Sequence, residues 1–282
     1  MSVNTSEAYR VGIKAFEQFR IGQGLSLVWP PPDTHLNMFI AHLSIKHYKH
    51  STAKSYIAAI SFKCKSHTLY DPTKNFVTQK LLQGMRRSTN TADTRLPITL
   101  DILQTIIPNL QFVCSSNYET SLYKAAFSLA FHALLRIGEI ALSKGNSHET
   151  IIQCQDVSLL TNKLMVSIKR SKTDQCGRGV TLSVNASHGI TCPVKAMLEF
   201  LQVRPSITGP LFCHFSGKPL TRYQFSAVLT KVLAKSSIDS KNFKSHSFRI
   251  GAATTLALQG ETQHVIQLAG RWQSNAYRTY IR

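Results

Sequence analysis

Apolar residues recur at helical intervals through the first third of the chain. The segments "SEAYRVGIKAFEQFR" and "HLNMFIAHLSIKHY", separated by the break "WPPPDT", each place apolar side chains three and four residues apart. This spacing predicts amphipathic helices. A third helix is expected over "STAKSYIAAISFKCKSH", with Ser51 as its N-cap, and a fourth over residues 74–87. The sequence therefore predicts an all-helical N-terminal domain over residues 1–87.

The helical pattern stops at "RRSTNTADTRLP", which is polar, poor in apolar residues and ends in proline. Such a composition is typical of a linker, which we place at residues 88–97. A second domain is then expected over residues 98–282.

The second domain has a mixed pattern. Ser116 and Glu119 have capping-box spacing at the start of a long, mostly buried helix that we expect to run through "LLRIGEIAL". The β-branched runs "KLMVSIKRSKTD" and "RGVTLSV" predict a hairpin that turns over residues 173–179, and Pro193 begins another helix. Helices are also expected over "TRYQFSAVLTKVLAKS", "SFRIGAATTLALQG" and "ETQHVIQLAG". The predicted fold class is mainly α with a small antiparallel β-sheet (α+β).

The charge of the chain points to a polyanionic partner. Its formal net charge is +19, with 13 Lys and Arg against 5 Asp and Glu in residues 1–95, and 20 against 9 in residues 96–282. Basicity spread over both domains favours a protein that grips nucleic acid over one with a basic tail, an anionic membrane surface being the alternative. Five lysines of the first domain are expected to contact phosphates, although a merely solvated face would look similar: Lys46, Lys49, Lys54, Lys63 and Lys65.

The cysteines indicate neither a metal site nor a disulfide framework. None of the six is spaced as C-x-x-C, and the sequence shows no signal peptide and no apolar run of 18 residues. We expect no metal, no cofactor and no membrane segment, and a protein of a reducing compartment.

Several charged residues stand where the local sequence does not explain them. Arg136 lies among leucines in "FHALLRIGEIAL", where a charge must be paired, and Glu139 is the nearest partner. His246 and Arg249 open a helix, whose free N–H groups already favour an anion. Lys172 follows a predicted strand. Taken singly, each also fits an ordinary ion pair or an exposed polar side chain.

Their order resembles the signature of the tyrosine recombinases, which include the phage integrases and the Xer and Cre-like enzymes. The segment "LLRIGEI" resembles the first arginine box of that family, "SKTD" its hairpin lysine, "HSFR" its H-x-x-R box and "AGRW…YIR" its final box. The first 87 residues, with "TAKSYIAAI", resemble its helical core-binding domain. Within the family, "GRWQSNAYRTYIR" is most similar to recombinases of DIRS-like retrotransposons.

The resemblance implies a site-specific recombinase or integrase that cleaves DNA through a 3′-phosphotyrosyl link, without metal or ATP. Tyr280 is the expected nucleophile, with Tyr277 as the alternative. The resemblance also implies Arg136 and Arg249 as phosphate-binding forks and Lys172 as general acid. His246 would accept the tyrosine proton or donate a hydrogen bond to the phosphate. Glu139 would orient Arg136 or His246, and Trp272 would donate a further hydrogen bond to the phosphate. Counting back from Tyr280 at the family spacing falls on Arg271 instead of Trp272, so Arg271 is the second choice.

The family also implies double-stranded DNA as the partner, a homotetramer on paired sites, and encoding by a mobile element. A eukaryotic element would place the protein in the nucleus, and otherwise it would be in the cytoplasm or nucleoid. Relatives usually continue with a tail helix, so a chain ending at Arg282 is either a fragment or docks through another element.

Three other functions remain open at this point. The chain could be a DNA-binding descendant without activity, a type IB topoisomerase, or a basic helical protein that coats a polyanion. Competent residues at every assignable position argue against the first, the compact length and "HSFR" against the second, and Arg136 among leucines against the third.

Overall fold

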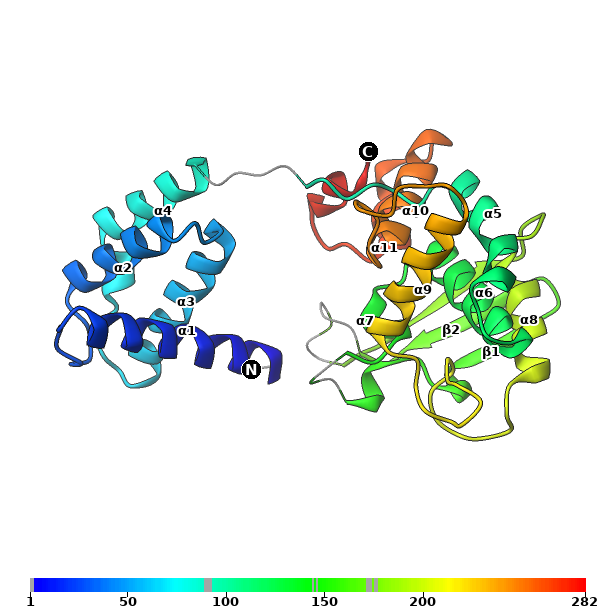
Figure 1. The fold of residues 1–282 in the computed structure, drawn as a ribbon, viewed down its shortest axis with the longest axis horizontal. Helices are drawn as coiled ribbons and strands as arrows, with labels where there is room; N and C mark the ends of the chain where they lie inside the picture. Colours follow the sequence, from blue (N-terminus) through cyan, green and yellow to red (C-terminus); the bar gives the residue numbers. More distant parts are fainter. Residues whose placement is uncertain (1–2, 89–92, 144, 146, 171–173, 175–176) are drawn as a thin grey trace. The chain divides into compact units, whose positions relative to one another are not determined.

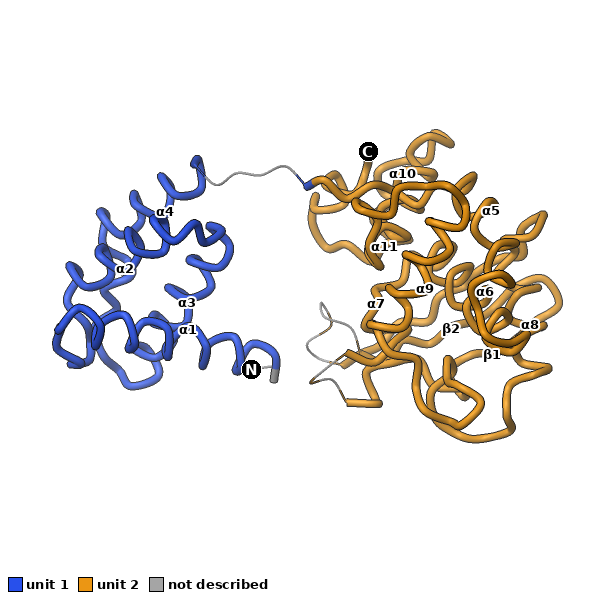
Figure 2. The backbone as a smooth tube through the Cα atoms, viewed as in Figure 1, with its two compact units in different colours: residues 1–93 blue, residues 94–282 orange. Residues whose placement is uncertain are grey.

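The computed structural model describes residues 3–88, 93–143, 145, 147–170, 174 and 177–282 (Figure 1). The chain divides into two compact units, Met1–Asp93 and Thr94–Arg282, which Figure 2 distinguishes by colour. Each unit has its own core of buried apolar side chains. The predicted class is confirmed, because helices dominate and the sheet is small and antiparallel.

The first unit is helical throughout. Its elements are α1 (Val3–Gly22), α2 (Asp33–Ile45), α3 (His50–Ser66), the 3₁₀ helix η1 (Pro72–Lys74) and α4 (Phe76–Ser88). Helix α1 packs on α3, and α2 on α4. The apolar stripes that predicted these helices form the core, where Phe16, Phe39 and Ile60 are almost completely buried. The predicted cap at Ser51 is wrong by two positions, because Lys49 is the N-cap and Ser51 lies in the first turn of α3.

The second unit combines helices with a three-stranded sheet. Its helices are α5 (Leu100–Asn109), η2 (Leu110–Phe112), α6 (Asn117–His132), α7 (Ile137–Ile140), η3 (His148–Thr150), η4 (Cys154–Asp156), α8 (Pro193–Val203), α9 (Arg222–Lys235), α10 (Ser247–Leu258), α11 (Gln263–Gly270) and η5 (Asn275–Tyr280). The strands are β1 (Val157–Leu160), β2 (Lys163–Ile168) and β3 (Val180–Asn185).

The strands pair antiparallel in the order β1-β2-β3, with Val157 opposite Val166 and Lys163 opposite Asn185. The hairpin of β2 and β3 matches the predicted one. Strand β1 was not predicted, because it has only four residues and three of them are exposed, so it lacks an alternating pattern. Helix α8 packs against β2, β3 and α6, and thereby joins the sheet to the helical core.

The end of the predicted linker is attached to α10. The backbone N–H of Leu96 donates to the carbonyl of Asn242, and that of Ile98 donates to the carbonyl of Ser247, both at 2.9 Å. Ile98 is fully buried, and a Cβ added to Gly251 would lie 1.7 Å from the Ile98 carbonyl oxygen. Glycine is therefore required at position 251, where the backbones of Ile98 and of α10 touch.

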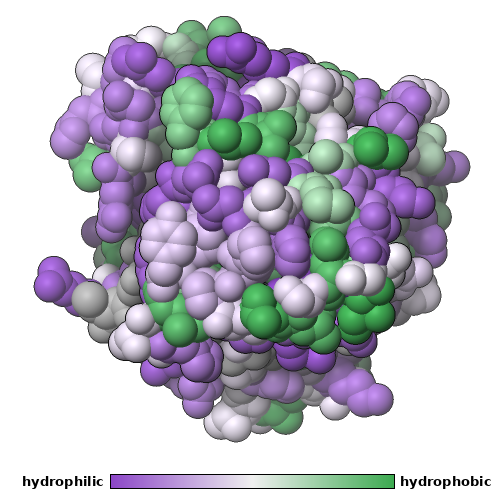
Figure 3. All heavy atoms as spheres, turned by 90° about the vertical axis from the view of Figure 1, so that its left-hand side faces the viewer, coloured by the Kyte–Doolittle hydropathy of each residue, from purple (hydrophilic) through white to green (hydrophobic). Residues whose placement is uncertain are grey.

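The surface shows no single large apolar face in the view of Figure 3, where hydrophilic side chains separate several small hydrophobic patches. Among the described residues, no helix combines the length and apolar character needed to cross a membrane.

Candidate active site

The site begins at the end of α6. We expected one helix to continue through Arg136 and Glu139, and this prediction is wrong. Leu134 has a φ of +47°, the Leu134 N–H donates to the Phe131 carbonyl, and the Leu135 N–H donates to the Ala130 carbonyl. This is a Schellman-type helix end, and it turns the chain so that Arg136 lies in extended backbone just before the short helix α7.

The turn gives the site its first two features. It leaves the Leu134 carbonyl outside the helix, where both Arg249 and Arg271 donate to it. It also makes Glu139 the third residue of α7, so that its carboxylate accepts the backbone N–H of Arg136 at 2.9 Å. The local break therefore places the carboxylate and the carbonyl beside each other.

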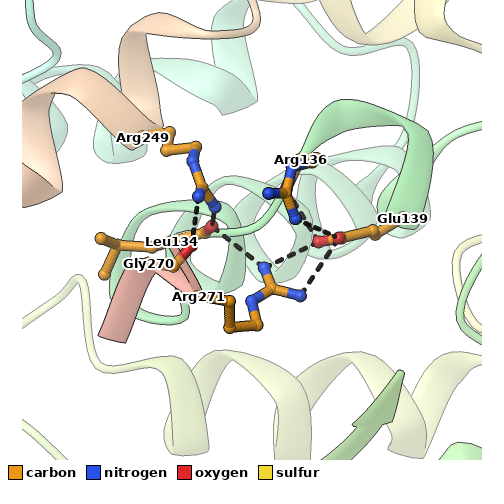
Figure 4. A network of polar contacts seen from close by, with 6 residues as sticks. All are labelled: Leu134, Arg136, Glu139, Arg249, Gly270 and Arg271. Carbon is orange, nitrogen blue, oxygen red and sulfur yellow. Dashed lines mark hydrogen bonds and ion pairs between the residues drawn. The ribbon is translucent and has the colours of Figure 1, made fainter. Parts of the chain in front are cut away.

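Three arginines from distant parts of the chain meet at these acceptors (Figure 4). Arg136 Nη1 lies 3.3 Å from Glu139 Oε1, while Arg271 donates to both carboxylate oxygens, at 3.1 and 2.9 Å. The side chain of Glu139 is 4% exposed. Three guanidinium groups around one carboxylate leave an excess of positive charge in a largely buried place. Such an excess favours an anionic ligand.

Arg249 is the most deeply buried of the three, at 1% exposure. Its Nη1 donates to the Leu134 carbonyl and its Nη2 to the Gly270 carbonyl, while its Nε is buried without a hydrogen-bond partner. Burial, together with the charges of Arg136 and Arg271, lowers the pKa of Arg249 below its ordinary value. A phosphate at the cluster would reverse this shift by supplying negative charge.

Two aromatic side chains lie against Arg249, and a third lies beside one of them. Its guanidinium carbon lies 4.3 Å from the ring centroid of Trp272 and 5.6 Å from that of Tyr280. The Tyr280 ring lies 4.9 Å from the rings of both His246 and Trp272. The sequence-predicted residues Arg136, Glu139, His246, Arg249, Trp272 and Tyr280 are thus brought together.

Arg271 enters the cluster more directly than Trp272. It caps α11 in the left-handed region, with a φ of 54°, and this turns its guanidinium toward Glu139. Trp272 instead packs by its ring against Arg249 and Tyr280. Its indole also lies so close to Gly270 that a Cβ there would come within 1.7 Å of it. Sequence reasoning ranked Trp272 first, and the spacing back from Tyr280 was the signal that favoured Arg271.

Tyr277 occupies a different environment from Tyr280. It is 1% exposed, and its hydroxyl donates to the side-chain oxygen of Gln263 on α11. Arg278 Nε lies 3.4 Å from the same hydroxyl. Tyr277 is therefore engaged in packing α11 against η5.

The predicted general acid, Lys172, lies outside the described residues. The strand before it is anchored by Lys169, whose Nζ lies 2.6 Å from the buried carboxylate of Asp156. Within the predicted turn, Asp174 accepts the backbone N–H groups of Arg178 and Gly179. Both contacts hold the described flanks of this turn in place.

The five lysines of the first unit that were predicted to contact phosphates are not equivalent. Lys63 pairs with Glu17 at 3.0 Å and lies 4.0 Å above the Trp29 ring, and Lys65 pairs with Asp71 at 3.3 Å. Within the described part of the chain, the other three are exposed and make no ion pair; we call Lys46, Lys49 and Lys54 the unpaired lysines. They are the better candidates for phosphate contacts.

The described residues contain no group of three or more His, Cys, Asp and Glu side chains placed to hold a metal ion. The chemistry that this arrangement can perform is that of fixed positive charge beside a phenol.

The model of the phage integrase family matches residues 103–281. No curated protein sequence matches the chain.

Three solved structures have the same fold. The first is the XerH site-specific recombinase bound to palindromic difH substrate, with 17% identity and a TM-score of 0.71. The match covers 97% of this chain and 75% of that chain. The second is the Tn1549 transposon integrase in complex with circular intermediate DNA, with 14% identity and a TM-score of 0.65. The match covers 100% of this chain and 90% of that chain. The third is a lambda integrase dimer bound to a COC′ core site, with 15% identity and a TM-score of 0.66. The match covers 100% of this chain and 72% of that chain.

Proposed function

The chain belongs to the phage integrase family of DNA recombinases, and from this premise we propose that it cleaves and rejoins DNA strands through a covalent 3′-phosphotyrosyl link to Tyr280. The observation that carries the proposal is the packing of the Tyr280 ring against His246 and Trp272, beside a buried arginine cluster with surplus positive charge.

The proposed step is a transfer of a phosphoryl group. The Tyr280 oxygen attacks phosphorus, a phosphotyrosyl bond forms, and the bond from phosphorus to the 5′ oxygen breaks. The released oxygen takes up a proton and leaves as a 5′-hydroxyl. Because the ester bond replaces a phosphodiester, the reverse attack by a 5′-hydroxyl rejoins DNA without ATP.

The roles of the site residues follow from their positions. Arg136, Arg249 and Arg271 would stabilise the charge that develops on the nonbridging oxygens, as preorganised donors do in phosphoryl transfer. Glu139 holds two of these forks and is a positioning residue. His246 would accept the Tyr280 proton or donate to the phosphate, and Lys172 would protonate the leaving oxygen.

Fixed guanidinium charge does here what a metal ion does in other phosphoryl transferases, so we propose activity without metal. Residues 1–87 are proposed as a DNA-binding domain joined by residues 88–97 to a catalytic domain at 98–282. The unpaired lysines of the DNA-binding domain would contact phosphates of the duplex. Assembly as a homotetramer on paired sites, origin from a DIRS-like mobile element and location in the nucleus of a eukaryotic host are further proposals.

The test needs no known target site. Supercoiled plasmid is incubated with the protein in EDTA, quenched with SDS and examined for relaxation and covalent protein–DNA adducts. We expect adducts with the unmodified protein and with Tyr277→Phe, and none with Tyr280→Phe. Adducts lost only in Tyr277→Phe would assign the nucleophile to Tyr277.

A negative result is resolved by a nicked DNA substrate that traps the covalent complex. Salt-sensitive DNA binding without adducts on any DNA tested would favour the inactive descendant. Relaxation of plasmid without exchange between two DNA partners would favour a topoisomerase.

A further inference from the structure

We propose that Thr254 is a positioning residue for Tyr280, and that together with Tyr277 it holds the nucleophile beside the arginine cluster. The inference rests on the proposed function, because it assigns how the phenol of that same site is delivered.

The contacts of Thr254 carry the proposal. This residue lies on α10, five positions after Arg249, and is 3% exposed. Its hydroxyl donates to the Tyr280 carbonyl at 3.2 Å and accepts the Arg282 backbone N–H at 3.1 Å. One side chain therefore binds the backbone on both sides of Ile281, directly after the nucleophile.

A second attachment precedes the nucleophile. Tyr277 and Tyr280 are three residues apart in η5, and in a 3₁₀ helix residues at this spacing lie above each other. The Tyr277 hydroxyl donates to Gln263 on α11, and its ring lies 6.5 Å from that of Trp272. The segment is thus bound to α11 before Tyr280 and to α10 after it.

Packing supports both attachments. Tyr280 and Ile281 are partly buried against the core of the second unit, next to buried Tyr277. Helix α10 also provides Arg249, so the nucleophile and a phosphate-binding arginine are joined through one helix.

The hydroxyl of Thr254 is tested by Thr254→Val, which keeps the shape and removes both hydrogen bonds. The matched control is Thr255→Val on the same helix, since among the described contacts the Thr255 side chain has none to the Tyr280 segment. We expect Thr254→Val to slow adduct formation on a nicked substrate about tenfold, with DNA affinity unchanged, because a loosely held nucleophile spends less time aligned. Thr254→Ser restores the hydroxyl and should restore most of the rate.

Equal rates for the two valine variants would overturn the role of Thr254. A loss that Thr254→Ser fails to restore would also overturn it, because packing alone would then be responsible.

The unmodified protein, assayed in parallel, distinguishes a failure of the proposed function from a failure of the role of Thr254. Its failure to form adducts contradicts the proposed function itself. Normal adducts with the results named above contradict only the role of Thr254.

Discussion

The carboxylate of Glu139 provides the most direct measure of how the arginine cluster is held together. It accepts four contacts between 2.9 and 3.3 Å, two from Arg136 and two from Arg271. Glu139→Gln keeps the shape of the side chain but removes its charge. Two arginines then lose their shared counter-ion while the third, Arg249, stays buried nearby.

The expected loss is large for a single substitution. Removing one partner of a buried ion pair costs about 3–5 kcal/mol, since the remaining charges stay desolvated. Glutamine retains one acceptor oxygen, so we expect the lower end, about 3 kcal/mol of unfolding free energy. For a unit of this size that corresponds to a fall in Tm of roughly 6–12 °C.

The assay is urea unfolding at low ionic strength, with Glu199→Gln as the matched control. Glu199 pairs with Lys124 at 2.6 Å, but its side chain is 36% exposed, and such surface pairs are worth about 0–1 kcal/mol. Sulfate or a short duplex should recover part of the loss in Glu139→Gln only, because an anion can replace the missing carboxylate. Equal losses for the two variants, or no anion effect, would refute the reasoning.

Three further results are expected. Gly251→Ala should destabilise the protein by about 2–4 kcal/mol in urea unfolding, because its Cβ would overlap the Ile98 carbonyl. Gly84→Ala, in an open helical position, should instead stabilise the protein by about 1 kcal/mol. Similar values for the two variants would contradict the contact between Gly251 and Ile98. Replacing the unpaired lysines with glutamine should reduce the slope of log K for DNA against log salt by about 3, and an unchanged slope would exclude them from phosphate contact. Burial alone would raise the pKa of Asp71, but hydrogen bonds from Thr73, Ser61 and Lys65 lower this pKa overall. The stability that Asp71 contributes is therefore complete above its ordinary pKa of 3.8 and is lost as the pH falls through the pKa of the folded state. Acid titration of Asp71→Asn should lack this loss.

The sequence predicted the elements better than it predicted their junctions. Periodicity located the helices because each stripe faces one core. The end of α6 was missed, since Leu134 adopts a left-handed conformation that the local pattern LLRI does not indicate. The two arginines that donate to the Leu134 carbonyl come from distant parts of the chain, so these contacts are also absent from the local pattern.

The candidate site shows the same division. Arg136, His246, Arg249 and Tyr280 could be selected because their types and order resemble the tyrosine recombinase signature. The choice between Arg271 and Trp272 could not be made from residue type, as both can donate. The direction of each side chain depends on the left-handed cap at Arg271, which only the folded backbone displays.

The attachment of Leu96 and Ile98 to α10 also defines where the chain can be divided for experiments. A catalytic fragment that began at residue 98 would leave the Asn242 carbonyl without its donor, and one that began later would also expose Gly251 and the Ser247 carbonyl. Both acceptors flank His246, at the start of the helix that carries Arg249. Tags, fusions and domain exchanges are therefore best joined upstream of residue 94, so that the residues bound to the start of α10 stay with it.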